Sequence, residues 1–124
     1  MRIVSWVLVL AAWAPAVLAQ PAEPRRGPLL ELAQVLGESH ALRQACAGPD
    51  DQFWRSRMMR LIEVERPDAL LEKRLKAAFN EGFEARAHGT CTLAARRAEA
   101  SAAARGRTLS ARLAGVVAPA ADAR

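Results

Sequence analysis

Residues 68–88 read DALLEKRLKAAFNEGFEARAH and show the clearest helical pattern in the chain. Apolar residues recur every three or four positions, which is the period of one helix face: Leu71, Leu75, Ala78, Phe79, Gly82 and Phe83. Charged residues occupy the other faces, among them Glu72 and Lys76 at the favourable i,i+4 spacing. A glycine inside a helix costs about 1 kcal/mol relative to alanine. We therefore predict an amphipathic helix that a neighbouring helix approaches closely at Gly82.

A first helix is predicted earlier in the chain, starting at Pro28. Proline suits the first turn of a helix because its missing N–H would have no partner there. The helix should end after Cys46, since glycine and proline follow at positions 48 and 49. Its apolar residues again lie on one broad face: Leu29, Leu32, Ala33, Leu36 and Leu42.

A second helix is predicted between these two. It should start at Asp50 or Asp51, since aspartate is a good helix cap, and end at Arg66, because the following proline disfavours helical geometry there. Helical spacing relates four apolar residues of this segment: Trp54, Met58, Leu61 and Ile62. No segment alternates with the period of a strand. The predicted fold is all-α: a small up-down bundle of three core helices plus a C-terminal Ala/Arg-rich helix, stapled by one disulfide.

The two ends of the chain differ from this core. Residues 1–19 begin with a short basic start, continue with an uncharged apolar run and end in small residues, which is the layout of a secretory signal peptide. We expect cleavage after Ala19; an uncleaved anchor is the alternative. We interpret residues 20–27 as a flexible linker, 28–91 as the helical core domain, and 92–124 as a helical tail broken near Gly106 and frayed at its end.

Export also bears on the two cysteines of the chain. Disulfides form and persist in exported proteins, so we expect Cys46 and Cys91 to be bonded. Cys46 ends the first predicted helix and Cys91 follows the third. Because short connections make successive helices antiparallel, these two positions fall at the same end of the bundle.

The net charge of +5 is unevenly distributed over the 124 residues. Residues 20–90 carry 11 basic and 11 acidic side chains, whereas residues 91–124 carry six basic and two acidic ones. The surplus fits either a solvated arginine-bearing helix or docking to an anionic envelope surface. We expect the partner to be an envelope protein or such a surface, reached through the basic tail. Neither nucleic acid nor a membrane span after cleavage is expected.

The sequence lacks the motifs of common catalytic and metal sites. It contains no CxxC, no HExxH and no glycine-rich phosphate loop, and its two histidines, His40 and His88, lie 48 residues apart. We therefore predict no catalytic residue, no metal ligand, no cofactor and no enzymatic activity.

Two runs of residues, FWRxxMMxLIxxE at 53–65 and RLxAAFNxGF at 74–83, stand between the two cysteines. Together they resemble a domain-of-unknown-function family of small, signal-peptide-bearing bacterial proteins with two cysteines and an AFN-x-G-aromatic segment. Phe83 stands where that family often has tyrosine. The resemblance implies an exported helical protein and supplies no activity.

Four residues are the candidate binding residues: Trp54, Arg55, Glu65 and Asn80. The leading interpretation is a non-catalytic binding or structural factor of the cell envelope. The alternative is a small-molecule or lipid binder whose pocket lies between the second and third helices, lined by Trp54, Phe79 and Phe83.

Overall fold

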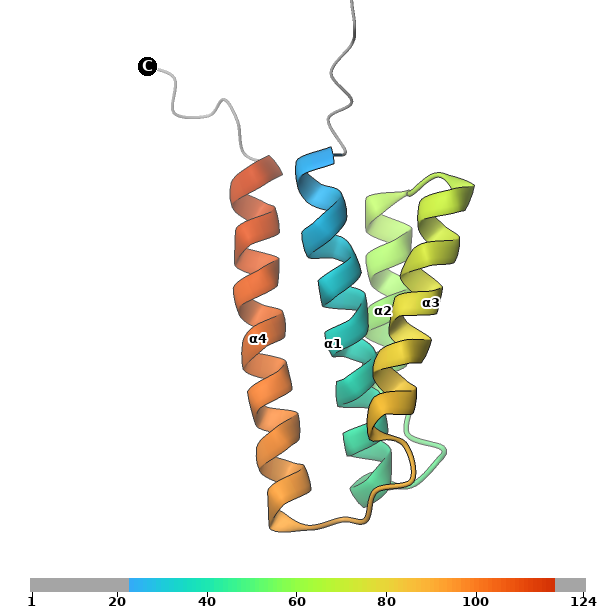
Figure 1. Ribbon diagram of the computed structural model, residues 1–124, viewed down its shortest axis with the longest axis vertical. Coiled ribbons are helices and arrows are strands. Elements are labelled where there is room, and N and C mark those ends of the chain that lie inside the picture. Colours follow the sequence, from blue (N-terminus) through green and yellow to red (C-terminus); the bar gives the residue numbers. More distant parts are fainter. Residues whose placement is uncertain (1–22, 118–124) are drawn as a thin grey trace, which may run out of the picture.

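A computed structural model describes residues 23–117, which form four helices and no strand. These helices are α1 (Glu23–Ala47), α2 (Phe53–Glu65), α3 (Ala69–Arg86) and α4 (Leu93–Val117). Successive helices run in opposite directions, and α1 lies between α3 and α4 with α2 behind (Figure 1). The predicted all-α up-down bundle is therefore confirmed. No helix in this part of the chain is both long and apolar enough to cross a membrane.

Helix α1 begins at Glu23, so the predicted start at Pro28 is wrong, as is the flexible linker for residues 23–27. Arg25 explains the longer helix. Its Nη1 donates to the backbone oxygen of Leu113 at 2.8 Å, and its Nη2 pairs with Glu65 at 2.6 Å. These partners lie 88 and 40 residues away, so no local pattern reveals them. The predicted signal peptide and residues 20–22 lie outside the described residues.

Helix α2 begins at Phe53, two or three residues later than predicted. The carboxylate of Asp51 does accept the Phe53 N–H, at 3.1 Å, but from the loop before the helix. The same Oδ1 accepts from Arg43 Nε at 2.9 Å, which holds Asp51 against α1. The helix ends before Pro67 as predicted, with Arg66 in the left-handed conformation at φ 47°. Asp68 then caps α3 by accepting the N–H of Leu71 at 2.7 Å.

Helix α4 is continuous through Gly106, so the predicted break there is wrong. It also belongs to the core, because Ala102, Leu109 and Leu113 are buried against α1. A Cβ at Gly106 would meet Val35 at 3.6 Å, which shows how closely the two helices pack. Burial of two leucines offsets the roughly 1 kcal/mol that a helical glycine costs. The predicted frayed end, residues 118–124, lies outside the described residues.

The backbones of α1 and α3 meet at two glycines. A Cβ at Gly82 would lie 2.0 Å from the carbonyl oxygen of Gln34, and a Cβ at Gly37 would lie 1.9 Å from that of Phe79. The predicted close approach at Gly82 is therefore confirmed. Only glycine at both positions allows this separation.

The predicted disulfide joins Cys46 to Cys91, whose Cα atoms are 4.7 Å apart. It ties the end of α1 to the connection between α3 and α4. The staple thus closes the end of the bundle opposite the α2–α3 loop (Figure 1).

Candidate functional site

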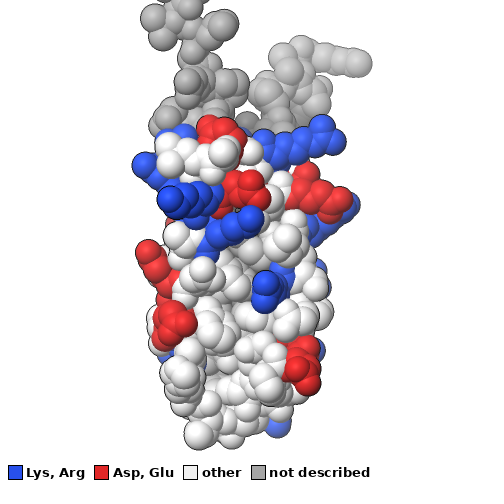
Figure 2. Space-filling model, turned by 90° about the vertical axis from the view of Figure 1, so that its right-hand side faces the viewer, with Lys and Arg blue, Asp and Glu red and all other residues white. Residues whose placement is uncertain are grey.

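A groove of about 720 Å³ lies between α2 and α3, with α1 at its floor. Its walls are mostly apolar, formed by Met58, Ile62, Phe79 and Phe83. Figure 2 shows the face that α2 and α3 form: charged side chains gather toward the end with the α2–α3 loop, and the opposite end is mostly uncharged. We refer to this feature as the α2/α3 groove.

His40 of α1 forms the floor of the α2/α3 groove and is only 5% exposed. The rings of Phe79 and Phe83 lie 5.6 and 5.4 Å from the imidazole, centroid to centroid. Its Nδ1 is buried and has no hydrogen-bond partner among the described residues. A buried polar atom left unpaired costs about 1–3 kcal/mol, so the unpaired Nδ1 of His40 destabilises the folded chain.

Burial lowers the pKa of His40 below its usual value of 6.5, and the positive charge of Arg55 lowers it further. The carboxylate of Asp51 opposes this shift and is outweighed. The imidazole is consequently neutral at pH 7, with one ring nitrogen able to accept a hydrogen bond and the other able to donate one.

Arg55 is a positively charged residue of the α2/α3 groove that could bind an anionic group. It is exposed, lines the groove, and makes no ion pair or hydrogen bond within residues 23–117. Lys76 also lines the groove, but its Nζ pairs with Glu72 at 3.0 Å. Asn80 adds an exposed amide and Glu84 a carboxylate. The structure thus brings together two of the predicted binding residues, Arg55 and Asn80.

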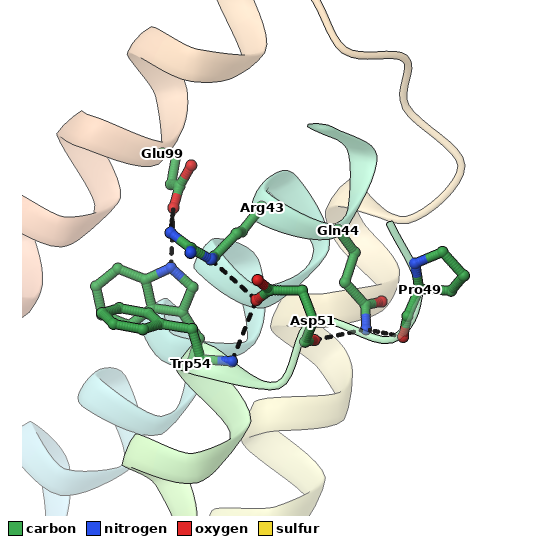
Figure 3. A network of polar contacts seen from close by, with 7 residues as sticks. Arg43, Gln44, Pro49, Asp51, Trp54 and Glu99 are labelled. Carbon is green, nitrogen blue, oxygen red and sulfur yellow. Dashed lines mark hydrogen bonds and ion pairs between the residues drawn. The ribbon is translucent and has the colours of Figure 1, made fainter. Parts of the chain in front are cut away.

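Trp54 lies outside the α2/α3 groove, so the expectation that it lines that pocket is wrong. Its Nε1 donates to Oε1 of Glu99 on α4 at 3.0 Å, in a network that continues through Arg43 and Asp51 (Figure 3). Helix α4 packs on α1, and the Trp54 side chain reaches from α2 toward α4 through this bond. It lines a second groove, between α2 and α4. A binding role for Trp54 stays a prediction.

Glu65 is also engaged inside the bundle. Its carboxylate accepts from Arg25, which bonds the backbone of Leu113 as well, so the contact links the ends of α2, α1 and α4. The Glu65 side chain is 19% exposed. Its position is that of a structural ion pair, and a ligand-binding role stays a prediction.

His40 is the site residue that sequence reasoning missed. It follows Leu36 by four positions and therefore lies on the apolar face of α1. A histidine on such a face is the signal that could have pointed to it. No group of three metal-binding side chains comes together in the described part of the chain.

Comparison with known proteins then gives the family. Residues 24–116 match the family model described as "Protein of unknown function (DUF2385)". The chain belongs to this family. The match spans all four helices nearly end to end and confirms the resemblance to a family of unknown function. No curated protein matches the chain, and no solved structure does either.

Proposed function

We propose that this chain is an exported, non-catalytic binding protein of the cell envelope, whose α2/α3 groove holds a small ligand with an apolar body and an anionic group. The observation that carries the proposal is His40, a buried histidine with an unpaired ring nitrogen at the floor of an apolar groove. Ligand pockets typically combine such apolar walls with a few polar groups that fix orientation.

The signal-like residues 1–19 support export, as does the disulfide between the two cysteines of the chain. Disulfides persist in oxidising compartments such as the periplasm and are rare in the cytosol. The staple closes a loop of 45 residues, the kind of constraint that a small exported domain uses to supplement its core.

The chemistry of the groove supports the ligand class. Met58, Phe79 and Phe83 offer an apolar surface for the body of the ligand. Arg55 provides a planar guanidinium that binds carboxylate or phosphate through two parallel hydrogen bonds. His40 supplies a neutral donor or acceptor at the floor. An anionic group beside Arg55 would also screen the charge that now acts on His40.

The lack of a hydroxyl or thiol nucleophile in the lining of the α2/α3 groove supports a non-catalytic role. The residues that line the α2/α3 groove include no serine, threonine or cysteine. His40 makes no hydrogen bond to a carboxylate that would orient it as a general base.

The test uses the imidazole signals of the protein, because the chain has only two histidines. We expect dodecanoate to shift the His40 ring signals in NMR spectra and to raise the pKa of His40. The signals of His88, which is exposed outside the groove, should stay in place. Dodecylammonium has the same alkyl chain and the opposite charge, and we expect it to bind at least about tenfold more weakly.

Two variants complete this experiment. Arg55→Gln should weaken dodecanoate binding about tenfold or more, in line with the loss of one charge-assisted contact. Arg74→Gln removes an exposed arginine of α3 that does not line the groove and should bind like the parent. Equal affinity for dodecanoate and dodecylammonium would contradict the proposal. So would His40 ring signals that do not shift when either amphiphile is added.

A further inference from the structure

The second groove, with a volume of about 630 Å³, lies between α2 and α4 on a different side of α1. We refer to it as the α2/α4 groove. Leu32 and Leu36 of α1 form part of its lining, together with Leu61 and Val64 of α2. Val64 is 61% exposed and adds apolar surface at the edge of the groove. The described chain therefore leaves apolar surface here without a covering element.

The lining of the α2/α4 groove carries charge of one sign only. Arg57 and Arg60 line it from α2 and Arg107 lines it from α4, and all three are exposed. No acidic residue is among the lining residues. Arg107 makes no ion pair or hydrogen bond within the described helices, whereas Arg60 pairs with Glu63 at 3.0 Å on the open surface.

The α4 wall of this groove is built from small residues. Ala103, Gly106 and Ser110 recur at helical spacing along it. Small side chains keep this wall low and let another backbone approach it closely. The groove therefore combines an apolar lining, arginines on its edges and a wall of small residues. These features fit an elongated partner that carries apolar side chains and negative charge.

We propose that the α2/α4 groove docks an acidic amphipathic helix of a partner protein. The apolar residues of such a helix would cover Leu61 and Val64, and its flanking carboxylates would meet the arginines on both edges. This is the helix-in-groove mode of recognition, read by anchors at i, i+3/i+4 and i+7.

Charge and shape select this occupant over the others. In a symmetric pair of copies of this chain the same surface meets itself, which would place the three arginines against their own counterparts. Residues 1–22 and 118–124 hold one acidic residue, Asp122, and so do not match the basic edges. A bilayer is flat or convex, so it does not reach into a groove between two helices.

The test uses the full-length protein and a designed helical peptide of about 14 residues, roughly 21 Å long. The peptide carries leucine along one face and glutamate on both flanks, and a matched peptide carries lysine in place of glutamate. Fluorescence anisotropy of the labelled peptides gives the dissociation constants. We expect the glutamate peptide to bind at least about tenfold more tightly than the lysine peptide, because each close charge pair at an interface contributes measurably.

Two pairs of variants localise the binding. Val64→Glu should weaken peptide binding at least about tenfold, because the new carboxylate in the groove repels the glutamates of the peptide. Leu70→Glu introduces the same residue at a similarly exposed position, 55% against 61%, and should leave affinity within about twofold of the parent. Arg107→Glu should weaken binding more than Arg97→Glu, which makes the same change in net charge on the same helix, outside this groove.

Three results would overturn this proposal. One is a glutamate peptide that does not bind at about 1 mM, the weak end of specific affinity. Another is equal weakening by the members of each variant pair. The third is tight binding to phosphatidylglycerol vesicles that Val64→Glu abolishes, which would make the groove a membrane site. The binding of dodecanoate in the α2/α3 groove is measured separately, so neither proposal depends on the other.

Discussion

Replacing Gly82 with alanine tests the packing that holds α1 against α3. The new Cβ would lie 2.0 Å from the carbonyl oxygen of Gln34, whereas ordinary van der Waals contact begins near 3.4 Å. The shortfall is about 1.4 Å. The obstacle is backbone, so no side-chain rotation relieves the clash. The two helices must move apart, and the packing of Leu75 and Phe79 against α1 must loosen with them.

The magnitude follows from two opposing terms. Overpacking a well-packed core costs about 1–3 kcal/mol, and a fixed backbone obstacle belongs at the upper end of that range. Alanine returns about 1 kcal/mol through its better helix propensity. The net expectation for Gly82→Ala is a loss of about 2 kcal/mol, or about 8–16 °C in Tm for a domain of this size.

The assay is unfolding by heat and by urea, followed by circular dichroism with the disulfide intact. Gly115→Ala in α4 is the matched control, since no atom lies within 4 Å of its added Cβ. It should leave stability unchanged or raise it by up to about 1 kcal/mol. A Gly82→Ala protein at least as stable as the parent would refute the close approach of the two helices.

Three other predictions concern stability. Cys46→Ser, or reduction, should lower the free energy of unfolding by about 4 kcal/mol, because the disulfide closes a 45-residue loop; an unchanged Tm would contradict this. Because the pKa of His40 is lowered in the folded chain, His40 binds a proton more readily in the unfolded chain below about pH 6.5. Tm should therefore fall as pH drops from 7 toward 5, and His40→Gln should flatten that slope. Trp54→Phe should cost about 1 kcal/mol through the lost bond to Glu99, and in urea unfolding its effect should shrink when Glu99 is already alanine; full additivity would argue against the bond.

Local patterns predicted that α1, α2 and α3 exist and part of their packing, but they wrongly predicted a break in α4. The apolar period predicted α3, Pro67 predicted the end of α2, and Gly82 predicted a close helix contact. Each of these rests on interactions within a few residues or on a rule about one residue type. The start of α1 was not accessible in this way, because Arg25 is held by Glu65 and by the backbone of Leu113 from distant parts of the chain.

The candidate site shows the same division. Arg55 and Asn80 are two of the four binding residues predicted from the sequence, and both line the α2/α3 groove. His40 is not among the predicted binding residues, although it lies buried at the floor of the same groove. Trp54 was assigned to that groove, yet it bonds Glu99 on α4. That contact depends on α4 packing into the bundle. The segment that forms α4 is rich in alanine and has few large apolar residues, so its sequence does not predict this packing.

The order of amino acids alone fixed the helical period, the positions where helices stop, the pairing of Cys46 with Cys91 and the uneven charge. These follow from short-range sterics and from composition, both of which are written along the chain. Tertiary packing decided on which side of α1 each helix lies. It also decided which polar side chains form hydrogen bonds or ion pairs inside the bundle and which remain accessible in a groove. Such outcomes depend on contacts between residues that lie 40 to 88 positions apart in the chain, and these contacts form only when the helices pack together.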